Sequence, residues 1–382
     1  MPGAAAKLPP TGIAASLDGT VNLQAKTFTA LNDNTISETA VGGQGSDRIL
    51  ISKGSIAAWG AGGSEDISGS IEYDLARLNI LLQPFLPQGL AMSGKHTMAL
   101  HITGTLTHHV GLRQLRGLVI APTALAFDKI SVDGLNLTNG SIPLAESAGV
   151  LTIGPAKIPA NNGYINLNEQ IDFNQPIPLL EQTGPVQISD NINVNGALGG
   201  SLLRFLPLTW GVSKSQAGLM QVSGVVNLQL QKLSLPLQQA ALKKDGTLEG
   251  TVSMTHLTTQ SPLFGMIGST IKPLTMLQGG NMSVADSGIR PTNFKLVQGR
   301  IEYQHLKMVL TSFGLDLSGW VALDNTLHMD VEITGAGLSV PIPLAIDGTT
   351  SQPKLKLSAK PLKQIGNTIK QLPNLLNNIF GH

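Results

Sequence analysis

Residues 327–333 read Leu-His-Met-Asp-Val-Glu-Ile, so that apolar and polar side chains alternate without a break. Because successive side chains of a β-strand point to opposite faces, this alternation predicts a strand with one buried and one solvated face. The same period of two recurs in Met98, Leu100 and Ile102; in Val222, Val226, Leu228 and Leu230; in Leu315 and Leu317; and in Leu355 and Leu357. Turns are expected at Asp133-Gly134, Asp245-Gly246, Ser287-Gly288 and Asp347-Gly348. The pattern predicts an antiparallel meander.

A few short helices interrupt the predicted strands. Apolar residues at helical spacing predict helices over about 75–86, 198–206 and 261–272, the first two ending at Pro87 and Pro207. Ser261 is a plausible N-cap of the third, with Pro262 at its first position. The simplest interpretation is that these helices pack on the sheet as core.

The first two helices belong to an internal repeat with a shift of 120 positions. Residues 82–104 align with 202–224 without a gap, matching Phe85-Leu86-Pro87 with Phe205-Leu206-Pro207 and Gly104 with Gly224. We therefore expect Phe85 and Phe205 to occupy equivalent positions. Repeats of one helix-then-strands unit commonly build extended sheets, because each unit buries the edge of its neighbour.

These patterns predict a mainly β fold: an elongated, curled, taco-like antiparallel sheet built from repeated helix-then-strands units. The expected divisions are a β-rich segment over 1–70, a first repeat over 71–190, a second repeat over 191–357 and an amphipathic helix over 358–382. In that last helix, Leu362, Ile365, Ile369 and Leu372 recur near lysines. It either covers an edge of the sheet or lies at a membrane or partner surface.

Composition excludes several classes of protein. The 382 residues include 42% hydrophobic but only 13% charged residues, with a net charge of +1 and no cysteine. Disorder and nucleic-acid binding are therefore not expected, and disulfides and thiolate metal sites are excluded. The chain has no uninterrupted apolar stretch of the ~20 residues that a spanning helix needs. The first residues lack the apolar core of a secretion signal, and we expect that an N-terminal part precedes them.

No motif predicts catalysis, a cofactor or a metal. The chain contains no Gly-x-Ser-x-Gly, Walker A or HExxH motif. His96, His101 and the pair His108-His109 suggest zinc, but neighbouring residues of a strand point to opposite faces, and solvated histidines on a polar face explain them more simply. We therefore expect a protein that is not an enzyme.

The C-terminal third resembles the AsmA-like proteins. The resemblance rests on the order of short motifs: the strand around Gly299; Gly319-Trp320-Val321-Ala322-Leu323-Asp324; the alternating strand 327–333; and Ile346-Asp347-Gly348-Thr349 followed by Pro353. It covers about 250–357 and extends loosely back to about 70. Residues 1–70 of this chain match no part of the family. The family's N-terminal membrane anchor and first domain have no counterpart in this chain.

The resemblance implies a periplasmic protein of diderm bacteria, related to TamB and other bridge-like lipid transfer proteins. Such a protein would be anchored in the inner membrane through a segment outside this chain. It would hold phospholipid acyl chains in a groove of its sheet and serve outer-membrane biogenesis or lipid homeostasis.

The residues suggest the same function independently, since a face rich in aliphatic side chains offers dispersion contact to hydrocarbon without fixing a headgroup. The candidate groove residues are Met98, Leu100, Ile102, Val222, Val226, Leu228, Leu315, Leu317, Met329 and Val331. The main alternative is a structural, scaffold or adhesive all-β surface protein, whose apolar face is an ordinary core. A hydrolase of envelope polymers is a third, weaker possibility, because no carboxylate pair stands out.

Overall fold

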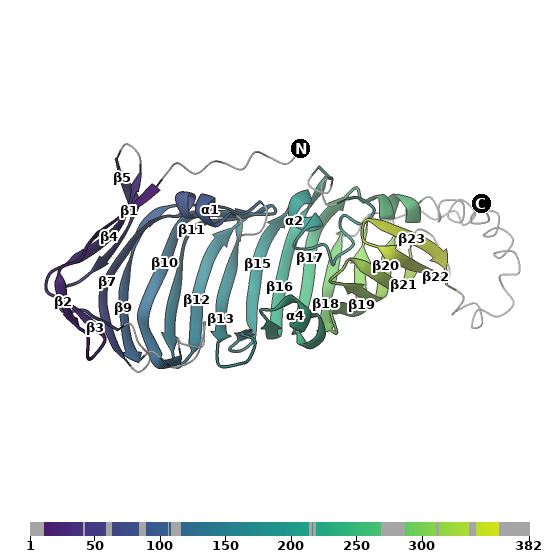
Figure 1. Ribbon diagram of the computed structural model, residues 1–382. Helices are drawn as coiled ribbons and strands as arrows, with labels where there is room; N and C mark the ends of the chain where they lie inside the picture. Colours follow the sequence, from purple (N-terminus) through teal and green to yellow (C-terminus); the bar gives the residue numbers. More distant parts are fainter. Residues whose placement is uncertain are drawn as a thin grey trace, which may run out of the picture. The chain divides into compact units, whose positions relative to one another are not determined.

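The protein is mainly β, and its strands are antiparallel, as the alternation predicts. In this computed structural model strands make up 66% of the described residues (Figure 1). The structure describes residues 11–40, 43–58, 63–83, 89–105, 107, 116–213, 216, 219–268, 287–310, 313–335 and 341–358. The predicted helix over 360–380, His108, His109 and Phe85 lie outside these ranges.

The chain divides into two compact units. Unit 1 comprises residues 1–186 with 234–238, and unit 2 comprises 187–233 with 239–382. The strands of unit 1 are β1 (Thr11–Ser16), β2 (Gly19–Asn22), β3 (Thr27–Ala30), β4 (Asn34–Ala40), β5 (Gly43–Ile51), β6 (Ile56–Ala58), β7 (Ser64–Asp74), β8 (Ala91–Ser93), β9 (Lys95–Thr105), β10 (Leu118–Val132), β11 (Leu135–Ser147), β12 (Val150–Ala160), β13 (Gly163–Asp172) and β14 (Leu179–Gln182). Those of unit 2 are β15 (Val186–Val194), β16 (Val222–Pro236), β17 (Thr247–Thr259), β18 (Gly288–Val297), β19 (Arg300–Val309), β20 (Gly314–Ala322), β21 (Thr326–Thr334), β22 (Ile342–Thr349) and β23 (Gln352–Leu357).

The first predicted helix is confirmed as α1 (Leu75–Leu82). The Asp74 side chain caps it by accepting hydrogen bonds from the backbone N–H groups of Ala76 and Arg77. Leu75 is buried and Leu78 packs beside it on the core of unit 1.

The second helix, α2 (Gly196–Gly200), begins earlier than predicted. Asn195 is its N-cap, and the side chain of Asn195 accepts a hydrogen bond from the backbone N–H of Leu198. Residues 201–206, which were predicted to be helical, form a series of turns. The reason is tertiary: this segment crosses the apolar face of unit 2, where Leu206, Leu208 and Trp210 are buried.

The third helix covers residues 262–268 within the described part of the chain. Its Leu263 and Ile267 are fully buried, which supports the core interpretation. The Ser261 hydroxyl donates to the carbonyl of Trp210 at 2.6 Å. A further helix, α4 (Gln239–Asp245), was not predicted.

The repeat has partial structural support. Gly104 in β9 and Gly224 in β16 both have positive φ values, 120° and 157°. A strand followed by a short helix also recurs, as β7–α1 and β15–α2. The predicted turn at Asp347-Gly348 is wrong: both residues pair within β22, and the turn follows at Thr350 and Ser351.

Candidate functional site

The apolar face of unit 1 is built by strand pairing. In β7 and β9, Ile67 lies opposite Ile102 and Ile71 lies opposite Met98, whereas the intervening pair, Ser68 and His101, points to the other face. Residues paired directly across antiparallel strands share a face. Met98, Leu100 and Ile102 therefore lie together on this face, as predicted.

Ile102 begins a row of directly paired residues across seven strands, from β7 to β14, which we call the Ile102 row. Its members are Ile67, Ile102, Ile120, Glu146, Leu151, Ile171 and Leu180. All except Glu146 are aliphatic, and all six aliphatic members are half-buried. A parallel row contains Leu144, Ile153, Glu169 and Gln182.

The deepest part of this face is a small core at α1. Tyr73, Leu75, Phe127 and Ile158 are buried there, and ten partly buried hydrophobic residues, including Met98, pack around them. The Tyr73 hydroxyl donates to the carbonyl of Ala126 at 2.9 Å. The aliphatic rows outside this core keep part of their surface accessible.

The corresponding face of unit 2 is sealed. Leu317 and Met329 are 0% exposed, Val331 is 1%, Leu315 2% and Val226 3%. Of the candidate residues in this unit, Val222 is also buried and Leu228 alone is half-buried. The expectation that Met329 lines a partly open trough is therefore corrected: it is a core residue.

Hydrogen bonds within unit 2 hold residues 201–211 against this face. The hydroxyl of Thr259 donates to the carbonyl of Leu208 at 2.7 Å, and the backbone N–H of Gly211 donates to Thr350 at 2.9 Å. Tyr303, whose pKa is raised by burial, reaches the carbonyl of Phe205 at 3.4 Å. Residues 201–211 thus close this face as a protein core.

Two carboxylates lie on the apolar face of unit 1. Glu146 is 2% exposed and its Oε1 accepts the backbone N–H of Gly149 at 2.8 Å, while its Oε2 is buried without a partner. Glu169 is 7% exposed and accepts the backbone N–H of Asn168. Burial raises the pKa of both carboxyls, because the charged form loses its hydration.

Several histidines pair with aspartates. His96, which is paired with Tyr73 on the same face as Met98, contacts Asp128 at 3.1 Å, and His328 contacts Asp347 at 2.6 Å. In the described part of the chain no set of three His, Cys, Asp or Glu residues is placed to hold a metal ion. This geometry does not support the zinc hypothesis for His96 and His101.

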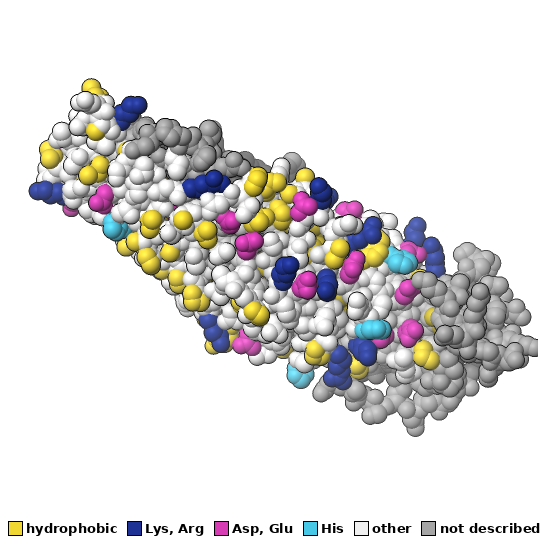
Figure 2. Space-filling view, turned by 90° about the horizontal axis from the view of Figure 1, so that it is seen from below, with side chains coloured by type: hydrophobic (Ala, Val, Ile, Leu, Met, Phe, Trp, Pro, Cys, Tyr) yellow, Lys and Arg dark blue, Asp and Glu magenta, His cyan; other side chains and the backbone are white. Residues whose placement is uncertain are grey.

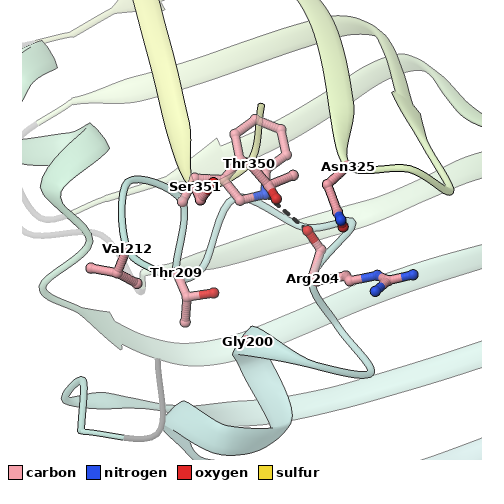
Figure 3. A pocket seen from close by; sticks show the side chains of 8 residues that line it. Gly200, Arg204, Thr209, Val212, Asn325, Thr350 and Ser351 are labelled. Atoms are coloured by element: carbon pink, nitrogen blue, oxygen red, sulfur yellow. Dashed lines mark hydrogen bonds between the residues drawn. The ribbon is translucent and has the colours of Figure 1, made fainter. Parts of the chain in front are cut away.

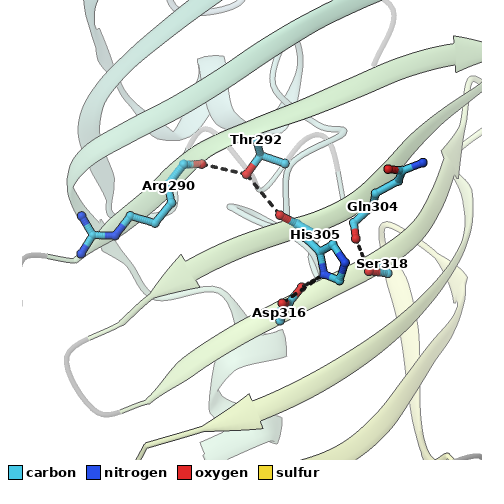
Figure 4. Close-up of polar contacts among 6 residues, drawn as sticks. All are labelled: Arg290, Thr292, Gln304, His305, Asp316 and Ser318. Carbon is cyan, nitrogen blue, oxygen red and sulfur yellow. Dashed lines mark hydrogen bonds and ion pairs between the residues drawn. The ribbon is translucent and has the colours of Figure 1, made fainter.

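The pair of His305 and Asp316 shows why these contacts do not form a catalytic triad (Figure 4). His305 Nδ1 lies 3.1 Å from Asp316, but the hydroxyl of nearby Ser318 donates to the carbonyl of Gln304 at 2.7 Å. Among the described residues no serine or threonine hydroxyl is hydrogen-bonded to any of these imidazoles. A nucleophile needs such a contact with its base.

Comparisons of the chain with models of protein families, with curated proteins and with solved structures found no match. In the described ranges no helix has the length and apolar character needed to cross a bilayer.

Proposed function

We propose that unit 1 holds lipid acyl chains on its half-exposed aliphatic face, as a binding or transfer protein that performs no catalysis. One observation carries the proposal: the aliphatic residues of the Ile102 row in unit 1 are half-buried, whereas the candidate groove residues of unit 2, except Leu228, are buried. Residues of this chain cover the apolar face of unit 2, whereas the described residues leave the Ile102 row of unit 1 half-exposed, and this difference supports the proposal.

Acyl chains suit this face better than a peptide does. The six aliphatic residues of the Ile102 row offer no hydrogen-bonding side-chain groups, and their backbones are paired within the sheet. Burying hydrocarbon stabilises a complex by ~0.8 kcal/mol per methylene, so about ten methylenes supply micromolar affinity before the costs of association. A peptide would leave its own backbone groups without partners there.

The surface charge seen in Figure 2 does not indicate a charged headgroup for the lipid proposed in unit 1. In Figure 2, lysine and arginine side chains lie among aspartate and glutamate side chains rather than in a patch of one sign. The net charge of +1 agrees with this mixture. We therefore expect long-range electrostatics to contribute little to the choice of lipid species.

A membrane contact is proposed at the hairpin of β2 and β3. Four large hydrophobic side chains within residues 17–31 are exposed: Leu17 by 61%, Val21 by 55%, Leu23 by 80% and Leu31 by 50%. Leu23 opens the turn, and Lys26 lies at its end. Exposed apolar side chains beside a cation are typical of segments that insert into the headgroup region.

The test compares two neighbours on β10 that point to opposite faces. Ile120 belongs to the Ile102 row, whereas Val119 lies opposite Thr103 on the other face and is 41% exposed. Lipid extracted from purified protein is measured by mass spectrometry for the wild type, Ile120→Asp and Val119→Asp. We expect bound lipid in the wild type and in Val119→Asp, and little in Ile120→Asp.

A photocrosslinking residue at Leu100 or at Ala99, which points to the other face, gives an independent measurement. We expect lipid adducts at Leu100 alone. A wild-type protein without lipid and without adducts would favour the structural, scaffold or adhesive alternative, in which this face is an ordinary core.

A further inference from the structure

A cavity of about 150 Å³ with both polar and apolar groups in its wall lies in unit 2, and no residue of the Ile102 row lines it (Figure 3). Its wall includes Arg204, Thr209, Trp210, Asn325, Thr350 and Ser351. A water molecule occupies about 30 Å³ in the liquid, so the cavity has room for a group the size of several waters. Hydroxyl, amide and guanidinium groups in its wall can hydrogen-bond to a polar ligand.

The backbone around the cavity is tied together by hydrogen bonds. The N–H of Gly211 donates to Thr350, and the N–H of Thr350 donates to Asn325, both at 2.9 Å. The indole Nε1 of Trp210, which is 1% exposed, donates to the carbonyl of Arg204 at 2.9 Å. The site is therefore formed before any ligand arrives, which lowers the cost of binding.

Two polar side chains at the cavity have unused donors. Among the described residues no carboxylate pairs with Arg204; its guanidinium makes one long contact, 3.5 Å to the carbonyl of Leu323, and lies over the ring of Phe205. Within the same described part, the Asn325 amide makes no side-chain hydrogen bond, and in Figure 3 it points toward Arg204.

The neighbouring turn adds positive charge. Lys243 and Arg300 line a second cavity of about 200 Å³ on the turn between β20 and β21, and Arg300 lies over the Trp320 ring at 4.2 Å. The acid in that turn, Asp324, accepts hydrogen bonds from the hydroxyl and backbone N–H of Thr326, which lower its pKa. Arg204, Lys243 and Arg300 thus lie around residues 323–325, which include one carboxylate, Asp324.

We propose that this cavity binds a phosphate group, either free or as a phosphomonoester, through Arg204 and Asn325. The planar guanidinium suits two phosphate oxygens at once, and the amide and hydroxyl groups provide further donors. The proposal does not depend on the acyl-chain function of unit 1.

Calorimetric titration of the full chain with inorganic phosphate, at constant ionic strength and against chloride, tests the site. We expect saturable binding by the wild type and at least about tenfold weaker binding by Arg204→Gln, since charge-assisted hydrogen bonds are the strong ones. Asn325→Asp should also bind weakly, because aspartate tolerates the φ of 72° at this position but repels the anion.

Arg290→Gln is the matched control. Arg290 is exposed on β18, its side chain extends away from its neighbours in Figure 4, and it has no ion pair among the described residues. The variant removes the same charge and should bind phosphate as the wild type does. Thermal melting within a few degrees of the wild type shows that each variant is folded.

Three ligands distinguish the source of the phosphate: inorganic phosphate, glycerol 3-phosphate and a soluble short-chain phosphatidic acid. Tighter binding of phosphatidic acid that Arg204→Gln abolishes indicates a lipid headgroup, and equal binding of all three indicates a free phosphate. The proposal is overturned if none binds, or if Arg204→Gln binds like the wild type. Ile120→Asp should bind phosphate normally, which separates failure of this site from failure of the acyl-chain proposal.

Discussion

Glu146 interrupts the Ile102 row with a carboxyl that has one backbone partner. Its Oε1 accepts the N–H of Gly149 in the turn between β11 and β12, and this contact explains its position on an apolar face. Burial nevertheless raises its pKa from 4.5, because the charged form loses hydration. Above the ordinary pKa the unfolded chain releases this proton more readily than the folded protein does.

Glu146→Gln should therefore stabilise the protein at neutral pH. The folded protein holds more protons than the unfolded chain between pH 4.5 and the raised pKa, so the stability of the wild type falls as pH rises through this window. The amide keeps an oxygen for Gly149 and carries no charge. We expect about 1 kcal/mol of stabilisation at pH 7 and a flatter profile, measured by urea unfolding from pH 4 to 8. Lower stability in the variant at pH 7 would contradict this account.

Gly319 shows where a strand requires glycine. Its φ is +147°, and a Cβ there would lie 2.2 Å from the carbonyl oxygen of His328 on the neighbouring strand. Backbone atoms cannot move aside as the end of a flexible side chain can. We expect Gly319→Ala to cost about 1–3 kcal/mol in thermal or urea unfolding. The control is Gly184→Ala, which has open space around its Cβ and should change stability little.

At the scale of elements, α4 shows what sequence patterns miss. It has no buried residue, so it carries no apolar stripe for periodicity to detect. The available signal was intrinsic propensity: Gln239-Ala-Ala-Leu-Lys-Lys consists of good helix formers, and Gly246 follows the end, with its N–H donating to Leu242 at 3.1 Å.

The hairpin of β2 and β3 carries the membrane-contact prediction. Leu23→Asp places a charge at an 80% exposed position, so folding should be unaffected while insertion into a bilayer becomes costly. We expect at least a several-fold loss of binding to phospholipid vesicles in a flotation assay. Leu219→Asp, at an 85% exposed leucine outside the hairpin, is the control and should bind as the wild type does. Equal binding by both variants would exclude the hairpin as the contact.

At the scale of the molecule, the two units use similar strands differently. Met329 in unit 2 is fully buried, whereas Leu100 in unit 1 is half-buried. Met329→Asp should lower stability by about 4 kcal/mol or more, because a buried charge without a partner is the most costly kind of substitution. Leu100→Asp should cost about 1–2 kcal/mol, since its carboxylate reaches water, yet should lose bound lipid. Melting and lipid content are measured on both variants; equal destabilisation would show that the face of unit 1 is also closed.

Local sequence determined the strands and their faces. The period of two at 98–102 and 327–333 correctly indicated which side chains point together, because alternation is a property of the extended backbone itself. The start of α1 was equally local, since Asp74 caps the adjacent turn. The mainly β, antiparallel class followed from these signals.

Only the tertiary structure decided which apolar face remains accessible. Met98 and Met329 belong to the same alternating pattern, and nothing in either strand says whether another segment covers it. In unit 2 residues 201–211 and the helix at 262–268 bury that face, at sequence separations of more than 50 residues from β21. The cavity that we propose to bind phosphate likewise joins Arg204 to Asn325 across more than 100 residues. Burial depends on contacts between distant segments, and local periodicity carries no information about them.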